Sequence, residues 1–411
     1  MAGVTFLALL AAAGLRSAPG VLLTPLHDSF GWERGELSVA AATGIFLYGL
    51  VGPFAAALMQ TLGLKRTLLI GLALMSASTG LSLFMSEPWH FLLTWGVLSG
   101  FGSGAVALVL GAAVVNRWFV ARRGLVMGLL SASTATGSLV FLPGMAALAQ
   151  SGGWRPVVIA VTVTAAALIP LVLLLMPERP SDIGQRPYGA TEDPDDASRG
   201  RAVDSVKLAL GVLVQAARTP AFWLLFATFF VCGFTTNGLV GTHLISLCGD
   251  KGLALVQAGA LLALMGLFDM VGTTASGWLT DRYDPRKLLF VYYALRGLSL
   301  MALPFLDFNV LSLTIFAVFY GLDWLATVPP TVRLANENFG ERNAPIVFGW
   351  VAVGHQTGAA TAAFLGGYLR DLQGRYLEAF VLAGFLGLAA AAAALWIRRP
   401  GAHPSVAGAH A

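Results

Sequence analysis

Five ionisable side chains lie deep inside apolar stretches of the sequence, where few other charges occur: Arg16, Asp269, Arg296, Asp323 and His355. If those stretches are helices, which rise about 1.5 Å per residue, each of the five lies roughly 14 to 22 Å from a helix end. A guanidinium offers a two-pronged donor to a carboxylate, and an imidazole or a buried carboxyl can take up and release a proton. The set therefore has the chemistry to bind an anion and to carry a proton.

The overall composition is that of an integral membrane protein. Of the 411 residues, 57% are hydrophobic and 11% are charged, and the mean hydropathy is +0.76, whereas soluble domains contain about 25% charged residues. Placing an ionisable residue at membrane depth costs at least ~2.5 to 3.5 kcal/mol, so each of the five is a functional hypothesis by default. We find no pairing of nucleophile, base and acid, no metal-ligand cluster and no large soluble domain, so we expect neither an enzyme nor a cofactor.

Apolar windows long enough to cross ~30 Å of hydrocarbon recur along the chain. We therefore predict an all-α membrane protein with twelve transmembrane helices in two pseudo-symmetric six-helix halves. The predicted helices cover residues 2–26, 34–59, 66–86, 90–115, 122–150, 155–176, 220–248, 254–279, 287–305, 309–334, 342–369 and 376–397. The corresponding domains are an N-terminal bundle (1–176), a cytoplasmic linker loop (177–219) with a possible amphipathic helix at 206–217, a C-terminal bundle (220–397) and a cytoplasmic tail (398–411).

Lys and Arg residues are distributed unevenly between the two predicted sides of the membrane. Of the 25, five lie on one side (Arg34, Arg155, Lys251, Arg370 and Arg375), two lie within the membrane (Arg16 and Arg296) and the remaining 18 lie on the other side. Because cytoplasmic loops carry the excess of positive charge, we expect both termini and the linker in the cytoplasm. The net charge of +4 then reflects topology in a bacterial inner membrane and does not indicate a nucleic-acid partner.

The two halves share a short sequence repeat. A shift of 221 residues (277 minus 56) lays AALMQTLGLKR, which starts at Ala56, over GWLTDRYDPRK, which starts at Gly277. The second stretch contains the pattern G-x-L-x-D-R-x-x-x-R-K, which resembles the signature loop of the major facilitator superfamily. This resemblance implies two six-helix repeats with a binding site between them, and secondary transport by alternating access.

The pattern is intact in the second half and degenerate in the first. Its residues are Asp281, Arg282, Arg286 and Lys287 in the second copy and Lys65 and Arg66 in the first, where Gln60 and Thr61 replace the acid and the arginine. We interpret both loops as a cytoplasmic gate that holds helix ends together in one state, with the second copy carrying more of the contact. The alternative is that these charges only follow the positive-inside rule.

A narrower resemblance extends over most of the chain. The stretches NRWFVARRGLVMGLLSASTATGS (116–138), RPSDIGQRPYG (179–189) and TPAFWLLFATFFVCGFTTNGLVGTHL (219–244) are similar to the monocarboxylate transporter and oxalate:formate antiporter branch, in particular its bacterial members. GLFDMVGTTASG (266–277) also resembles that branch. Its mammalian members have an arginine, associated with the substrate carboxylate, four residues after the aspartate, and this chain has Thr273 there. An anion anchor must then lie elsewhere, or the substrate is not a simple monocarboxylate.

The mid-membrane charges have different expected roles. Arg16 is the predicted anion anchor, because no acid of equal depth lies near it in the sequence; snorkelling or a carbonyl contact is the alternative. Arg296 and Asp323 have matching depth on consecutive antiparallel helices, which favours a structural ion pair over a part in proton coupling. Asp269 is the predicted proton carrier, since desolvation favours the neutral carboxyl and a nearby cation favours the carboxylate. A fixed ion pair with Arg16 or Arg296 is the alternative for Asp269.

Other polar residues in the predicted spans are weaker candidates for substrate contact. His355 can bind substrate or lie on the proton path, and an interhelical hydrogen bond is an equal alternative for it and for Gln356. Asn237 and Tyr48 are cavity candidates. The stretch GFTTNGLVGTH around Asn237 could be locally unwound, although a continuous helix is favoured.

Together these features predict a secondary active transporter that moves a small organic anion, monocarboxylate-like, in symport with a proton. It should need no cofactor or metal and should work as a monomer in the lipid bilayer. The alternative is an exporter or exchanger of metabolites or drugs. Drug/proton antiporters of the superfamily carry a motif in the fifth span that ends in Gly-Pro. Here Gly128 and Gly137 have the leading spacing, but the stretch 141–144 departs from that ending, which argues against drug export.

Overall fold

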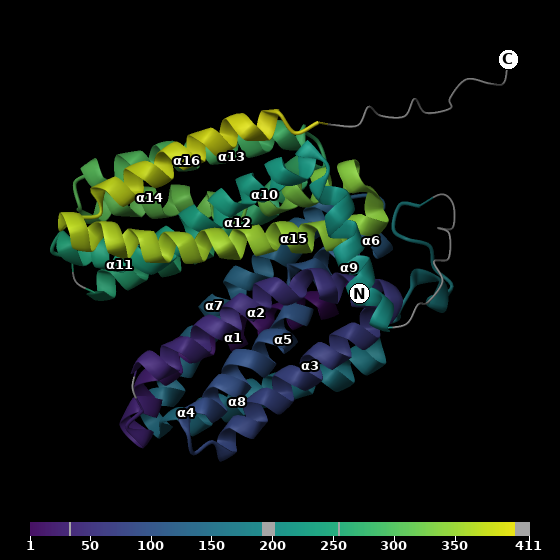
Figure 1. Ribbon diagram of the computed structural model, residues 1–411, viewed down its shortest axis with the longest axis horizontal. Helices are drawn as coiled ribbons and strands as arrows, with labels where there is room; N and C mark the ends of the chain where they lie inside the picture. Colours follow the sequence, from purple (N-terminus) through teal and green to yellow (C-terminus); the bar gives the residue numbers. More distant parts are fainter. Residues whose placement is uncertain (33, 191–201, 254, 399–411) are drawn as a thin grey trace.

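The computed structural model describes residues 1–32, 34–190, 202–253 and 255–398, and these are almost entirely helical (Figure 1). The apolar runs form helices because, in lipid, each backbone polar group must find its partner within its own segment. The first part of the chain forms α1 (Ala2–Phe30), α2 (Arg34–Thr61), α3 (Leu64–Leu81), η1 (Ser82–Phe84), α4 (Pro88–Phe91), η2 (Leu92–Leu98), α5 (Ser99–Ala105), α6 (Leu108–Trp118), α7 (Arg123–Gly152), α8 (Trp154–Leu175) and η3 (Pro180–Ile183). The rest forms α9 (Ala202–Ala217), α10 (Pro220–Gly233), η4 (Phe234–Val240), α11 (Gly241–Asp250), α12 (Leu255–Thr280), α13 (Pro285–Ala302), η5 (Leu303–Phe305), α14 (Val310–Asp323), α15 (Val328–Gln373) and α16 (Leu377–Leu395).

The number of membrane crossings agrees with the twelve predicted from the sequence. Ten described stretches are long and apolar enough to cross a membrane. One of them, Val310–Arg370, has 61 residues, and a straight helix of that length would extend ~90 Å, about three hydrocarbon thicknesses. Gly340, at φ 75° and ψ 153°, interrupts it, so it crosses twice. α7 fills the predicted span 122–150 and completes the twelve.

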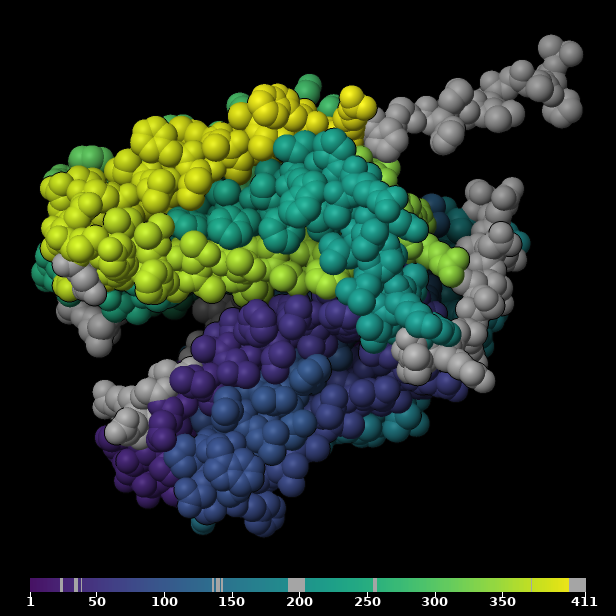
Figure 2. Space-filling view, in the orientation of Figure 1, coloured from purple at the N-terminus to yellow at the C-terminus, as the bar shows by residue number. Residues whose placement is uncertain are grey.

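The helices gather in two groups, α1–α8 and α10–α16, which lie on either side of a cleft. Figure 1 shows the two groups converging towards one end. There the contacts run along α7 with α12 and along α2 with α15. Figure 2 shows the groups separated by a gap at the opposite end. We call the converging end, which carries the α2–α3 and α12–α13 loops, the closed end, and the other the open end.

Glycines let α7 and α12 touch backbone to backbone near the closed end. A Cβ atom at Gly277 would lie 2.2 Å from the carbonyl oxygen of Gly124, and one at Gly128 would lie 2.6 Å from the carbonyl oxygen of Thr273. No side chain fits at such distances, so the two halves approach more closely here than any other residue would allow.

The linker contains an amphipathic helix, α9, which lies across the closed end. Its face with Ala209, Val212 and Ala216 is buried, whereas Val206 and Leu210 are exposed. The indole of Trp350 on α15 donates a 3.1 Å hydrogen bond to the backbone carbonyl of Ala209. The linker residues 191–201 and all of the expected tail after Arg398 lie outside the described residues.

Candidate functional site

The tenth predicted span is broken at mid-length, where a turn at residues 324–327 separates α14 from α15. The break follows from Pro329 and Pro330, which have no backbone N–H to bond the carbonyl groups four residues earlier. Those carbonyls belong to Leu325 and Ala326. At membrane depth, the backbone groups that the break releases need other partners.

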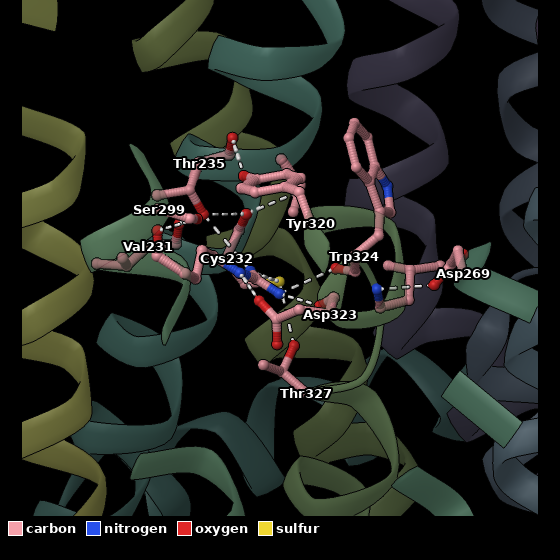
Figure 3. Close-up of polar contacts among 12 residues, drawn as sticks. Val231, Cys232, Thr235, Asp269, Ser299, Tyr320, Asp323, Trp324 and Thr327 are labelled. Atoms are coloured by element: carbon pink, nitrogen blue, oxygen red, sulfur yellow. Dashed lines mark hydrogen bonds and ion pairs between the residues drawn. The ribbon is translucent and has the colours of Figure 1, made fainter. Parts of the chain in front are cut away.

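Arg296 on α13 supplies donors to one side of the 324–327 turn. Figure 3 shows the acceptor residues Asp323 and Trp324. The Nε of Arg296 donates to Asp323 Oδ2 at 2.6 Å, and its Nη2 donates to the backbone carbonyls of Asp323 and Trp324, the latter at 3.1 Å. The Arg296 side chain is fully buried. The ion pair expected between Arg296 and Asp323 is therefore present, and the same guanidinium also donates to two backbone carbonyls where α14 ends, those of Asp323 and Trp324.

Asp269 on α12 holds the other side of the turn. Its Oδ1 accepts hydrogen bonds from the backbone N–H of Leu325 at 2.9 Å and from the Thr273 hydroxyl at 2.6 Å. Ser276, further along α12, donates to the carbonyl of Ala326 at 2.5 Å. The Asp269 side chain is fully buried, and no donor in the described chain reaches its Oδ2. Asp269 is thus bound to the turn and forms no ion pair with either of the two arginines considered as fixed partners.

Arg16 on α1 and Gln356 on α15 both lie against α2, at Tyr48 and Gly49 respectively. The guanidinium carbon of Arg16 is 4.1 Å from the centroid of the Tyr48 ring. Gln356 packs against Gly49, the neighbour of Tyr48, so that a Cβ atom at Gly49 would lie 2.6 Å from Gln356 Cγ. Arg16 is half-buried, and no acidic partner for it occurs within the described residues. Consecutive residues of α2 therefore contact a cation of the first half, Arg16, and an amide side chain of the second half, Gln356.

His355 and Asn237 have other surroundings. The His355 imidazole lies against Phe229 on α10, with ring centroids 5.0 Å apart, and it is 6% exposed. Asn237 is exposed and lies in η4, which continues the helix with wide π-type turns, so the stretch around it is not unwound. In the part of the chain that the structure describes, no recorded contact joins His355 or Asn237 to Arg16.

Asp281 joins the two halves at the closed end. Its two carboxylate oxygens accept from the first backbone N–H groups of α7, those of Gly124 at 2.7 Å and Leu125 at 2.9 Å. The N-terminus of a helix carries a partial positive charge, so a carboxylate binds there through both hydrogen bonds and the helix dipole. The predicted gate residue thus makes the contact that the gate interpretation requires.

The remaining predicted gate residues make weaker or local contacts. In the first copy, Gln60 takes the place of the acid and donates to the backbone carbonyl of Arg342, so this loop also reaches the opposite half. The other side chains stay within their own half or are exposed: Lys65 donates to the Leu173 carbonyl, Arg282 stacks on Trp278, Arg286 pairs with Asp284, and Arg66 and Lys287 are exposed. Of the two copies, the second therefore makes the charged contact with the opposite half, through Asp281.

Replacing Asp281 with Asn is expected to weaken the closed end. The amide keeps the shape but loses the charge that binds the α7 N-terminus. We expect this to destabilise the state with the closed end in contact by about 1–2 kcal/mol, which is roughly a tenfold change in its equilibrium with the state in which this end is open. Cycling in reconstituted vesicles should slow several-fold while equilibrium solute binding changes little. Asp284→Asn is the matched control, because Asp284 caps the start of α13 within its own half. Unchanged cycling in Asp281→Asn would remove Asp281 from the gate.

Two further contacts across the closed end were not predicted from the sequence. Arg123 on α7 pairs with Glu341 on α15. Asn116 and Asn336 exchange amide hydrogen bonds of 2.7 and 3.0 Å. A signal for the second pair exists in the sequence, since the two asparagines are 220 residues apart, within one residue of the shift that relates the two halves.

The sequence profile of the Major Facilitator Superfamily matches residues 5–344 and 277–410, which together cover nearly the whole chain. The chain belongs to this superfamily. It is therefore a multi-pass membrane protein and a secondary transporter, as the signature loop indicated.

Individual members of the superfamily resemble this transporter at low identity. Monocarboxylate transporter 13 of Rattus norvegicus is 28% identical over 378 residues, which cover 92% of this chain and 83% of that protein. The uncharacterized MFS-type transporter YcxA of Bacillus subtilis (strain 168) is 24% identical over 393 residues, covering 94% and 92%. Among solved structures, the fucose:proton symporter FucP of E. coli superposes with a TM-score of 0.73 at 15% identity, over 97% and 98% of the two chains. The match to FucP establishes the fold alone.

The Pro329-Pro330 pair predicts a kink in the tenth span, and the structure has a full break there, with a turn at 324–327 between α14 and α15. The pairing of Asp269 with the Leu325 amide could not be predicted, because it depends on how α12 and α14 are rotated about their axes. Thr273 has a role that its place in the sequence did not suggest: its hydroxyl donates to Asp269.

Proposed function

We propose that this superfamily member transports a small organic anion, monocarboxylate-like, together with a proton, by alternating access to the cleft between its halves. The observation that carries the proposal is Arg16, a half-buried guanidinium on Tyr48 with no acidic partner among the described residues. A cation at membrane depth is costly without a counter-charge, which a bound carboxylate would supply. The similarity to monocarboxylate transporter 13 supports the same class of solute.

Asp269 is the proposed proton carrier. Asp269 and Asp323 each keep one carboxylate oxygen, Oδ2 and Oδ1 respectively, without a donor within the described chain. Asp323 is ion-paired with the guanidinium of Arg296, whereas Asp269 forms no ion pair with a described residue. A proton bound at Oδ2 of Asp269 would neutralise a carboxylate that no cation contacts directly. The opposite oxygen would keep its place on the Leu325 amide.

We further propose that the closed end is cytoplasmic. This end carries the loops with the excess of Lys and Arg, which in membrane proteins face the cytoplasm. The cleft of the described state would then open to the outside of a bacterial inner membrane, with both termini inside. The two six-helix domains, 1–176 and 220–397, would rock against each other while the monomer works, joined by the cytoplasmic linker loop 177–219.

Uptake by reconstituted vesicles tests the proposal. The purified protein is placed in liposomes, and accumulation of labelled short-chain mono- and dicarboxylates is measured with and without a pH gradient that is acidic outside. We expect at least one carboxylate to accumulate against its gradient only when the pH gradient is imposed. Asp269→Asn should no longer accumulate the carboxylate in response to the pH gradient. It should still exchange labelled for unlabelled solute, because exchange does not require a proton to bind or leave the carrier.

The outcomes separate the alternatives. Failure of every carboxylate to enter the vesicles would overturn the organic-anion assignment. Exchange that is rapid but indifferent to the pH gradient would identify an exchanger and refute proton symport. An Asp269→Asn variant that still responds fully to the gradient would exclude Asp269 as the proton carrier.

A further inference from the structure

The 324–327 turn carries an indole whose N–H group has no recorded partner. Trp324 is half-buried, and its ring packs edge-on against Tyr320, with centroids 5.7 Å apart and an angle of 80° between the planes. Figure 3 shows the indole directed away from the side chain of Asp323. No hydrogen bond of its Nε1 atom to another described residue is recorded. The N–H is therefore available to a solute.

The position of Trp324 indicates that it faces the cleft. Its ring edge lies beside Gly241, at 3.9 Å from where a Cβ atom would be. Gly241 follows Asn237 by four residues, so both lie on one face of the helix, and both are exposed. An exposed amide at membrane depth faces a water-filled cavity and not lipid, because lipid offers it no partner. Trp324 borders that same face.

The backbone of Trp324 is fixed on both sides by charged groups. Its own carbonyl accepts from Arg296 Nη2 at 3.1 Å, and the next amide, that of Leu325, donates to Asp269 at 2.9 Å. A broken helix usually allows its turn to move, but here two buried side chains from α12 and α13 determine where the indole lies. A donor held in this way is preorganised for binding, which limits the entropy lost when a solute binds.

We propose that Trp324 is a specificity-determining residue that touches the transported solute, with its indole N–H donating to an acceptor oxygen. The inference rests on the proposed function, in which Arg16 of the first half binds the carboxylate. Trp324 belongs to the second half, so a solute held by both residues needs a carboxylate and a second acceptor oxygen. An acid without that oxygen would leave the indole N–H without an acceptor in the closed cleft. Such an acid would therefore bind more weakly.

The test compares acids that differ by one oxygen. Uptake into vesicles is measured for pairs of short carboxylates of equal chain length, with and without a hydroxyl group, in Trp324→Phe, Trp324→Tyr and the unsubstituted protein. Loss of one hydrogen bond predicts a KM about tenfold higher for the hydroxylated acids in Trp324→Phe, with kcat and the KM of the plain acids nearly unchanged. Trp324→Tyr restores a donor and should recover part of the loss. Trp396→Phe is the matched control, since Trp396 is 75% exposed at the end of α16.

Two results would overturn the inference. One is a Trp324→Phe variant with unchanged KM for every acid, and the other is an equal rise in KM for plain and hydroxylated acids, which would show packing alone. Failure of the unsubstituted protein to transport any acid would refute the proposed function instead. Normal transport with an unaltered Trp324→Phe profile would refute only the role of Trp324.

Discussion

Arg16→Ala is expected to lower the initial rate of carboxylate uptake by roughly 100-fold at solute concentrations below KM, because two charge-assisted hydrogen bonds are worth ~3 kcal/mol. Arg16→Lys keeps the charge but loses the planar fork, so it should lie between, about tenfold below the unsubstituted protein. The measurement is uptake of labelled acid into vesicles, with the amount of inserted protein determined for each variant. Arg218→Ala is the control, since Arg218 is an exposed arginine directly after the end of α9.

The comparison with Lys distinguishes binding from folding. If Arg16 only packed against Tyr48, Arg16→Ala and Arg16→Lys would lower the stability of the protein and leave the KM for the carboxylate unchanged. Uptake by Arg16→Ala within twofold of the unsubstituted protein would exclude Arg16 as the anion anchor, and the carboxylate would then need another partner.

Arg296→Met is expected to destabilise the protein by roughly 3–5 kcal/mol, the usual effect of removing one partner of a buried ion pair. The loss has two parts: Asp323 becomes an uncompensated carboxylate, and the carbonyl of Trp324 loses its donor. It can be measured as a lower midpoint of thermal denaturation in detergent. Arg375→Met provides the control, because its ion pair with Glu378 is exposed and such pairs contribute ~0–1 kcal/mol.

A double variant separates the two parts. Arg296→Met with Asp323→Leu removes the uncompensated charge, so it should be more stable than Arg296→Met alone. It should remain less stable than the unsubstituted protein, because the carbonyl of Trp324 still lacks its donor. A double variant as stable as the unsubstituted protein would show that the guanidinium is not needed to close the break.

The sequence predicted contacts that depend on the depth of a residue along its helix or on a motif. It did not predict contacts that depend on how two helices are rotated about their axes. The pairing of Arg296 with Asp323 follows from equal depth on consecutive antiparallel helices, which spacing alone indicates. The contact of Asp281 with α7 follows from the intact motif. The hydrogen bond from Leu325 to Asp269 depends on the rotation of α12, and a sequence does not record that rotation.

The same limit applies to the candidate substrate residues. Arg16 and Tyr48 are within reach of each other because α1 and α2 are neighbours in the chain, and Gln356 on α15 packs against Gly49, the residue after Tyr48. His355, the residue before Gln356, turns to α10 instead. Consecutive residues of a helix point about 100° apart. His355 and Gln356 were candidates because both lie at mid-membrane depth, and depth alone does not show which of the two faces α2.

The amide hydrogen bonds exchanged between Asn116 and Asn336 join the two halves in a nearly symmetric way. A side chain that contacts its own counterpart is characteristic of an isologous interface between two identical subunits related by a two-fold axis. The two asparagines are 220 residues apart, at almost equivalent positions of the two halves. A homodimer of six-helix chains would bring this asparagine against its own copy, so the closed end of this single polypeptide contains a contact of the kind that a symmetric dimer would make.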